Sequence, residues 1–187
     1  MTQDATVSLP NPALPRFLAD RMVGRLAKWL RILGYDTAYL PQLSPQGLLR
    51  EGRRQDRILL TRDTRLLRQK DASPLVFIRD DHFREQLKQV VTECRLMPLE
   101  LLFSRCSECN QVLETVTKER IKDQVPEYVW QTQDAFHRCS ECHRVYWGAT
   151  HKTHVLAELQ RMGVWESRSR NSELETLNSP TPNPKLF

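Results

Sequence analysis

The stretch FLADRMVGRLAKWLRILGYDT, residues 17–37, sets the pattern for the first half of the chain. An apolar strand is expected over 16–20, and it ends on the carboxylate of Asp20. An amphipathic helix is expected over 21–33, because apolar residues recur on one face at helical spacing. Those residues are Met22, Leu26, Trp29, Leu30 and Leu33. The stretch therefore predicts a strand that leads through a carboxylate into a helix.

The strand-and-helix alternation continues to about residue 95. Gly34 is expected to end the first helix in the left-handed conformation. Further strands are expected over 37–40, 57–61 and 74–78, and further helices over 45–54, 64–69 and 81–94. The strands are apolar throughout, which is typical of a parallel sheet with both faces covered. Residues 15–95 therefore predict a small α/β domain with a parallel sheet flanked by helices.

Acidic residues follow three of the expected strands. Asp20 follows the first, Asp63 follows RILLT, and the Asp80–Asp81 pair follows PLVFI. In a parallel sheet these positions share the carboxyl edge, where such folds place their sites. Clustered carboxylates there can hold a divalent ion that activates water against a phosphodiester. Each aspartate also stands at a helix start, where Asp is a favoured N-cap, so capping is the alternative.

Positive charge is concentrated in the same domain. Residues 15–95 contain 17 Lys and Arg against 10 Asp and Glu, whereas residues 96–150 contain 6 against 8. One stripe of the first helix is basic and begins next to Asp20. It consists of Arg21, Arg25, Lys28 and Arg31. These side chains could follow a nucleic-acid backbone towards the acids, or they could form a solvated helix face without a partner.

Four of the five cysteines form two CxxC pairs. Cys106 and Cys109 are separated by 29 residues from Cys139 and Cys142. Two such pairs supply the tetrahedral thiolate shell that zinc prefers, and a four-cysteine shell leaves no open position for catalysis. We expect a structural zinc ribbon with a long spacer, which a pair of hairpins can occupy. Cys94, the fifth cysteine, is expected to be a small buried residue.

The composition sets the broad class and the boundaries. A hydrophobic content of 40% and a charged content of 27% are typical of a globular protein. No run approaches the ~20 apolar residues of a membrane span, and the first residues lack signal-peptide features. We expect a cytoplasmic protein. The expected parts are a flexible arm over 1–14, the α/β domain, a linker over 96–104, a ribbon over 105–152, and a tail over 153–187 that is largely disordered after about 165.

Three segments together resemble a known family. FLADRMVGRLAKWLRILGYDT, ILLTRD (58–63) and YWGATH (146–151) behind the last CxxC are similar to the PIN-like RNase domain with a C-terminal zinc ribbon, named after the Mut-seven exonuclease. The resemblance covers about residues 15–152. It implies a PIN-like fold and a magnesium- or manganese-dependent ribonuclease activity. It also implies that Asp20 and Asp63 bind the metal, with Thr61 as a supporting hydroxyl and Arg62 on the substrate side.

Two functional hypotheses follow. In the first, the protein hydrolyses RNA at a divalent ion held by Asp20, Asp63 and one of Asp80 and Asp81. The resemblance implies three or four acids, one of them from between the Asp20 and Asp63 motifs, but 43–55 offers only Glu51, flanked by arginines in an expected helix. Either the Asp80–Asp81 pair supplies the third acid, or the site holds metal weakly. In the second, the protein is a non-catalytic RNA-binding or assembly module with a degenerate site.

Overall fold

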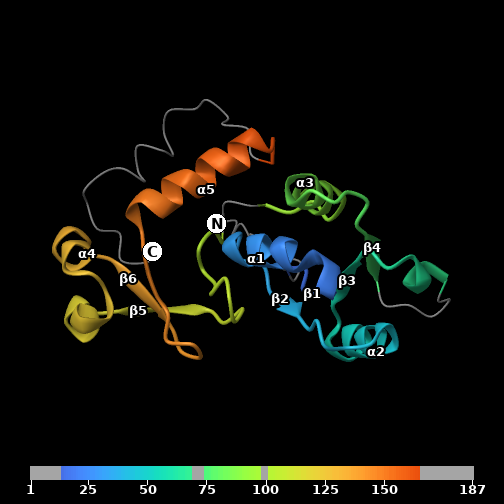
Figure 1. The fold of residues 1–187 in the computed structure, drawn as a ribbon, viewed down its shortest axis with the longest axis horizontal. Coiled ribbons are helices and arrows are strands. Elements are labelled where there is room, and N and C mark those ends of the chain that lie inside the picture. Colours follow the sequence, from blue (N-terminus) through green and yellow to red (C-terminus); the bar gives the residue numbers. More distant parts are fainter. Residues whose placement is uncertain (1–13, 69–73, 98–100, 165–187) are drawn as a thin grey trace, which may run out of the picture.

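The structure, a computed structural model, describes residues 14–68, 74–97 and 101–164 (Figure 1). The arm expected over 1–14 and the disorder expected after about 165 lie, except for Leu14, outside these residues. The described chain forms a four-stranded sheet followed by a three-stranded one. We call residues 14–97 the sheet domain and residues 101–148 the ribbon.

The first sheet is parallel, as predicted. Its strands are β1 (Phe17–Ala19), β2 (Thr37–Tyr39), β3 (Ile58–Thr61) and β4 (Leu75–Phe77), in the order β2-β1-β3-β4. Because successive strand residues point to opposite faces, Phe17 and Ala19 join one apolar cluster and Leu18 joins another. Both faces are therefore buried, which explains the uninterrupted apolar runs.

Helices cover both faces of this sheet. They are η1 (Arg21–Val23), α1 (Gly24–Ile32), α2 (Pro45–Gln55), η2 (Thr64–Arg68) and α3 (Phe83–Glu93). Helices α1 and α3 pack on the larger apolar cluster, and α2 packs on the smaller one. The helix expected over 21–33 thus begins as a 3-10 turn. Gly34 follows it at φ +90°, as predicted.

The ribbon contains three antiparallel strands, β5 (Leu113–Val116), β6 (Phe136–Cys139) and β7 (Val145–Trp147). The spacer between the CxxC pairs does not hold two hairpins. After β5 it forms η3 (Lys118–Gln124) and α4 (Glu127–Thr132). These elements cover one face of the ribbon sheet, where Ile121 and Phe136 are fully buried. The long spacer therefore supplies the ribbon with a small core of its own.

The last helix, α5 (Ala149–Arg161), extends across the boundary expected at residue 152 and returns to the sheet domain (Figure 1). Val155, Leu159 and Met162 are buried in the larger apolar cluster. Glu158 forms an ion pair with Arg84 of α3. Residues at the i, i+4 and i+7 positions share a helix face, so one side of α5 completes the core of the sheet domain.

The first CxxC turn docks on the sheet domain at the amino end of its strands. Arg31, which is 7% exposed, donates to the carbonyl oxygens of Ser107 and Glu108 at 3.1 and 2.6 Å. Asn110 accepts from the Thr37 amide at 2.9 Å and donates to Asp36 at 2.7 Å. The ribbon is therefore fixed at the edge of the sheet that lies opposite Asp20.

Candidate functional site

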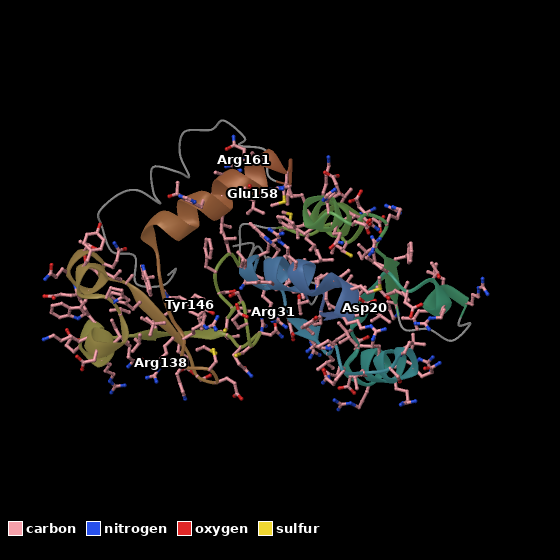
Figure 2. The ribbon with its side chains drawn as sticks, in the orientation of Figure 1. Asp20, Arg31, Arg138, Tyr146, Glu158 and Arg161 are labelled. Atoms are coloured by element: carbon pink, nitrogen blue, oxygen red, sulfur yellow. The ribbon has the colours of Figure 1, made fainter. Side chains whose placement is uncertain are left out.

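Two of the expected acids lie at the carboxyl ends of neighbouring strands. Asp20 directly follows β1, and Asp63 is the second residue after β3. Because β1 and β3 pair in parallel, both acids stand at the same edge of the sheet. They line one cavity of about 450 Å³ together with the loop after β2 and with η2. We call this the acidic cavity. The Asp20 label in Figure 2 shows where in the molecule the cavity lies.

Three groups donate hydrogen bonds to the Asp20 carboxylate. Asp20 is 3% exposed. One carboxylate oxygen accepts from the Met22 amide at 2.7 Å, which is the N-cap bond of η1. The other accepts from the Thr61 hydroxyl and from the Arg62 amide at 3.2 Å. The capping interaction thus exists, and it leaves the second oxygen fixed by the end of β3.

Thr61 connects the two acids. Its hydroxyl donates to Asp20 and accepts from the Asp63 amide at 3.0 Å. Thr61 itself is fully buried at the end of β3. A single side chain therefore sets the spacing between the Asp20 carboxylate and the backbone of Asp63.

Asp63 is paired with an arginine of its own turn. The Arg65 guanidinium donates to both carboxylate oxygens, at 2.8 and 2.6 Å, and the Arg65 amide adds a third bond at 3.0 Å. The hydrogen bonds from the Arg65 side chain are the main reason that the pKa of Asp63 lies below its usual value. The Arg65 side chain is 73% exposed, so it can leave Asp63 at small cost.

Asp80 and Asp81 stand outside the acidic cavity. Asp80 accepts from the His82 amide at 2.7 Å, as an N-cap would. Asp81, 84% exposed, pairs with Arg62, whose guanidinium also donates to the Asp80 carbonyl oxygen. Within the described residues, no three carboxylates gather at one point. The structure thus brings Asp20 and Asp63 together and leaves Asp80 and Asp81 on the outer side of Arg62.

The four paired cysteines come together as one cluster. Their sulfur atoms all lie within 4.8 Å of one another, and the Cys106 and Cys142 sulfurs are 3.7 Å apart. Four thiolates at the usual Zn–S bond length of about 2.3 Å stand about 3.8 Å from one another. The donor set therefore fits a tetrahedral zinc ion. Cys94, which ends α3 and is half-buried, does not belong to the cluster.

The two CxxC turns share one backbone design. In each, the amide four residues after the first cysteine donates to that cysteine's carbonyl oxygen at 3.0 Å. The donors, Asn110 and His143, have positive φ angles of 70° and 59°. Burial raises the pKa of the Cys106 thiol, but hydrogen bonds from the Tyr146 hydroxyl and from backbone amides outweigh burial and lower it to about 7. Cys106 is thereby shifted towards the thiolate, whereas burial raises the pKa of Cys109 to about 12 and also raises that of Cys139.

Comparison with protein-family models assigns most of the chain to one family. Residues 15–159 match the family model of the Mut7-C RNAse domain. The chain belongs to this family. No curated protein and no solved structure shows significant similarity to it. In the part of the chain that the structure describes, no helix has the length and apolar character needed to cross a membrane.

The Mut7-C RNAse domain of this chain extends into α5. The family match ends at residue 159, beyond the ribbon and within the helix that closes the core of the sheet domain. An RNase domain also implies RNA as the substrate. The match thus covers the acidic cavity, the cysteine cluster and most of α5 as parts of one domain.

The basic residues of η1 and α1 are divided among different contacts in this domain. Arg21 lines the acidic cavity. Arg25 stacks over the Phe83 ring at 3.8 Å, and Lys28 pairs with Glu108 of the ribbon. Arg31 is buried against the first CxxC turn. Of the expected stripe, Arg21 alone lines the acidic cavity, and Arg62 joins it there.

Arg65 was not among the residues expected at the site. It lines the acidic cavity and contacts Asp63 more closely than any residue that was proposed from the sequence. The position of Arg65 in the sequence could have indicated this contact. Arg65 is two residues after Asp63, near the start of a turn that brings the two side chains together. The contact between Thr61 and Asp20 had no such signal, because it joins residues 41 positions apart.

Proposed function

We propose that this protein is a cytoplasmic ribonuclease that hydrolyses RNA phosphodiester bonds at a divalent ion held by Asp20 and Asp63. The observation that carries the proposal is that both carboxylates line one cavity together with Arg21, Arg62 and Arg65. Phosphodiester hydrolysis needs this combination, because anionic ligands hold the metal and cations hold the phosphate.

The donor set at the acidic cavity fits magnesium or manganese. Magnesium commonly takes only one or two protein carboxylates and completes its shell with water and substrate phosphate. Asp20 and Asp63 meet that requirement without a third acid. A divalent ion at this position supplies an activated water and offsets the charge of the phosphate under attack.

The remaining groups of the cavity bind and orient. The Thr61 hydroxyl and the Met22 amide hold the Asp20 carboxylate in one rotamer. Arg65 neutralises Asp63 in the free protein and is exposed enough to turn towards a phosphate once Asp63 binds metal. Arg21 is a second cation on the same wall. We assign substrate binding to Arg21 and Arg65.

The test is a cleavage assay on single-stranded RNA with magnesium or manganese. Asp20→Asn and Asp63→Asn should each lower the rate by on the order of 100-fold or more. Asp56→Asn is the matched control, because Asp56 is exposed at the opposite edge of the sheet and has a φ of 50°, which Asn tolerates. Full activity in both site variants would refute the proposed site.

The second candidate is a non-catalytic RNA-binding module. It is favoured by the pairing of Asp63 with Arg65 and by the position of Asp80 and Asp81 outside the cavity. This function predicts salt-sensitive RNA binding without metal-dependent cleavage. The same Asn variants separate the two candidates, since in a pure binding module they would leave RNA affinity unchanged or raise it.

A further inference from the structure

A second cavity, of about 360 Å³, lies between the ribbon and the sheet domain. We call it the ribbon pocket and define it by Phe103, Thr115, His137, Tyr146, Trp147 and Lys152. Its walls are the segment that leads into the ribbon, the face of the ribbon sheet that η3 and α4 leave open, and the start of α5. Figure 2 labels Tyr146 and Asp20 on opposite sides of Arg31, so the pocket is remote from the acidic cavity.

Helix α1 extends from one cavity towards the other. Arg21, at the start of η1, lines the acidic cavity, and Ile32, the last residue of α1, lines the ribbon pocket. Eleven residues at the helical rise span about 17 Å. A strand with stacked bases, spaced about 3.4 Å per nucleotide, would cover that distance with about five nucleotides, and a more extended single strand would need fewer.

Three polar side chains form a row across the pocket side of the ribbon sheet. Thr115 of β5 is paired in register with His137 of β6, and His137 is paired with Tyr146 of β7. Directly opposed residues of neighbouring strands lie on the same face. The Tyr146 ring is fixed, because its hydroxyl is bonded to the Cys106 sulfur at 3.1 Å. The row thus presents a hydroxyl, an imidazole and a rigid aromatic ring to one ligand.

The imidazole of His137 makes no hydrogen bond to another described side chain or backbone group, although the residue is half-buried. A neutral imidazole carries one donor and one acceptor nitrogen. That combination matches the edge of a nucleobase, which carries donors and acceptors side by side.

Apolar surface is left open to solvent at the same place. Trp147 is 39% exposed and Val112 is 56% exposed, and both line the pocket. Exposed aromatic rings in a concave site are the platforms on which single-stranded nucleic acids stack their bases. The side chains of Lys152 and Arg105 add positive charge to the walls, which suits a polyanion more than an uncharged ligand.

We propose that the ribbon pocket binds one unstacked nucleobase of single-stranded RNA. Tyr146 of the row and Trp147, which lines the pocket from the end of β7, provide the stacking surface, and Thr115 and His137 contact the edge of the base. The inference rests on the proposed function in that RNA is taken as the ligand. A pocket of this volume admits a base and not a duplex, in which the bases stay stacked. The ribbon thereby holds the strand several nucleotides away from the acids.

The test measures binding of a fluorescein-labelled eight-nucleotide RNA to the zinc-loaded protein without added magnesium or manganese. Trp147→Ala should weaken binding by roughly 5- to 100-fold, the range found for loss of one stacking residue. His137→Ala should weaken it by about fivefold. Tyr128→Ala is the matched control, because Tyr128 is a 74% exposed aromatic residue on α4, and it should bind as the unmodified protein does.

Zinc content and melting temperature of each variant show whether it folds, and His137→Asn, a smaller change, provides a second probe of the same contact. If folded Trp147 and His137 variants bind RNA normally, the pocket proposal is overturned while cleavage at the acidic cavity can still stand. If they bind weakly but Asp20→Asn and Asp63→Asn cleave normally, the pocket stands and the proposed catalytic site fails. Crosslinking of a photoreactive RNA base to the ribbon pocket would support the proposal; a crosslink confined to the acidic cavity would count against it.

Discussion

Asp36 shows how one carboxylate can serve the fold and not the chemistry. It precedes β2 and therefore lies at the amino edge, away from the strand ends at which a metal site is expected. There it accepts from Arg57 at 2.6 Å and from Asn110 at 2.7 Å. Burial by itself would raise the pKa of Asp36, but these hydrogen bonds outweigh burial and lower it to about 2. The Asp36 carboxylate therefore helps to hold the first CxxC turn at the amino ends of the strands.

The low pKa of Asp36 makes stability depend on acid. A group whose pKa falls on folding stabilises the protein above its unfolded pKa, here 3.8, and loses that effect as the pH falls towards 2. Asp36→Asn should therefore cost on the order of 2 kcal/mol at pH 7 and much less near pH 2. Urea denaturation of both proteins at several pH values measures the difference, and a cost that stays constant with pH would contradict this assignment.

Arg65 would compete with a metal ion for Asp63 in the proposed site. Because its guanidinium occupies both carboxylate oxygens, an ion would have to displace it before Asp63 could bind. Arg65→Gln should raise manganese affinity by about 2- to 5-fold, the value of an exposed ion pair. Arg68→Gln makes the same charge change on the exposed last residue of η2 and serves as the control. Calorimetric titration with manganese provides the measurement, and equal affinities in the two variants would show that Arg65 does not compete.

At the level of elements, the sheet domain was predictable from the sequence because its strands are continuous apolar runs and its first helix is strongly amphipathic. The cysteine cluster was predictable as well, since the CxxC spacing requires little context. The role of Arg31 was not, because a basic residue opposite an apolar helix face is normally solvated; here the ribbon covers that face. Residues from 153 onward were expected to form a tail, whereas Val155, Leu159 and Met162 are buried in the core of the sheet domain. Their partner surface is contributed by segments much earlier in the chain.

The end of α1 depends on Gly34. It has a φ of +90°, and a Cβ there would stand 2.1 Å from the Leu101 carbonyl oxygen. Gly34→Ala should therefore destabilise the protein by about 2–4 kcal/mol, through backbone strain and overpacking together. Gly163 has a φ of +62°, and a Cβ there would meet nothing within 4 Å, so Gly163→Ala should cost only the strain, about 1 kcal/mol. Chemical denaturation measures the free energy of unfolding of both variants. Equal losses of stability would show that the close approach of residue 101 is not the cause.

Arg31 and Lys28 both extend from α1 to the first CxxC turn, but in different surroundings. Arg31 is buried and satisfies carbonyl oxygens of Thr37, Ser107 and Glu108. Lys28 makes an ion pair and is 51% exposed. Removal of Arg31 would leave buried carbonyl oxygens unpaired at about 1–3 kcal/mol each, whereas an exposed pair is worth less than about 1 kcal/mol. Arg31→Met should thus lower the melting temperature clearly and Lys28→Met hardly at all; similar melting temperatures would argue against a buried joint.

At the scale of the whole molecule, the ribbon and the sheet domain are connected at two separate places. The first CxxC turn is bonded to Arg31, Thr37 and Asp36 at the amino edge. After β7, α5 returns to the core through Val155 and Leu159. The sheet domain therefore receives part of its core from residues that follow the ribbon. A small domain of this size gains stability from such additions, because its own core buries limited apolar surface.

Zinc should consequently stabilise the sheet domain as well as the ribbon. A zinc ion in the cluster would fix Cys106 and Cys139, and the turn that begins at Cys106 carries the carbonyl groups that hold Arg31. Removal of zinc or Cys106→Ser should lower the temperature of one shared unfolding transition by roughly 10 °C, which corresponds to a loss of a few kcal/mol in a chain of this length. Cys94→Ser, which changes a half-buried cysteine outside the cluster, should leave zinc content unchanged. Differential scanning calorimetry measures these transitions. Independent units would give two transitions, and the unfolding temperature of the sheet domain would not change when zinc is removed.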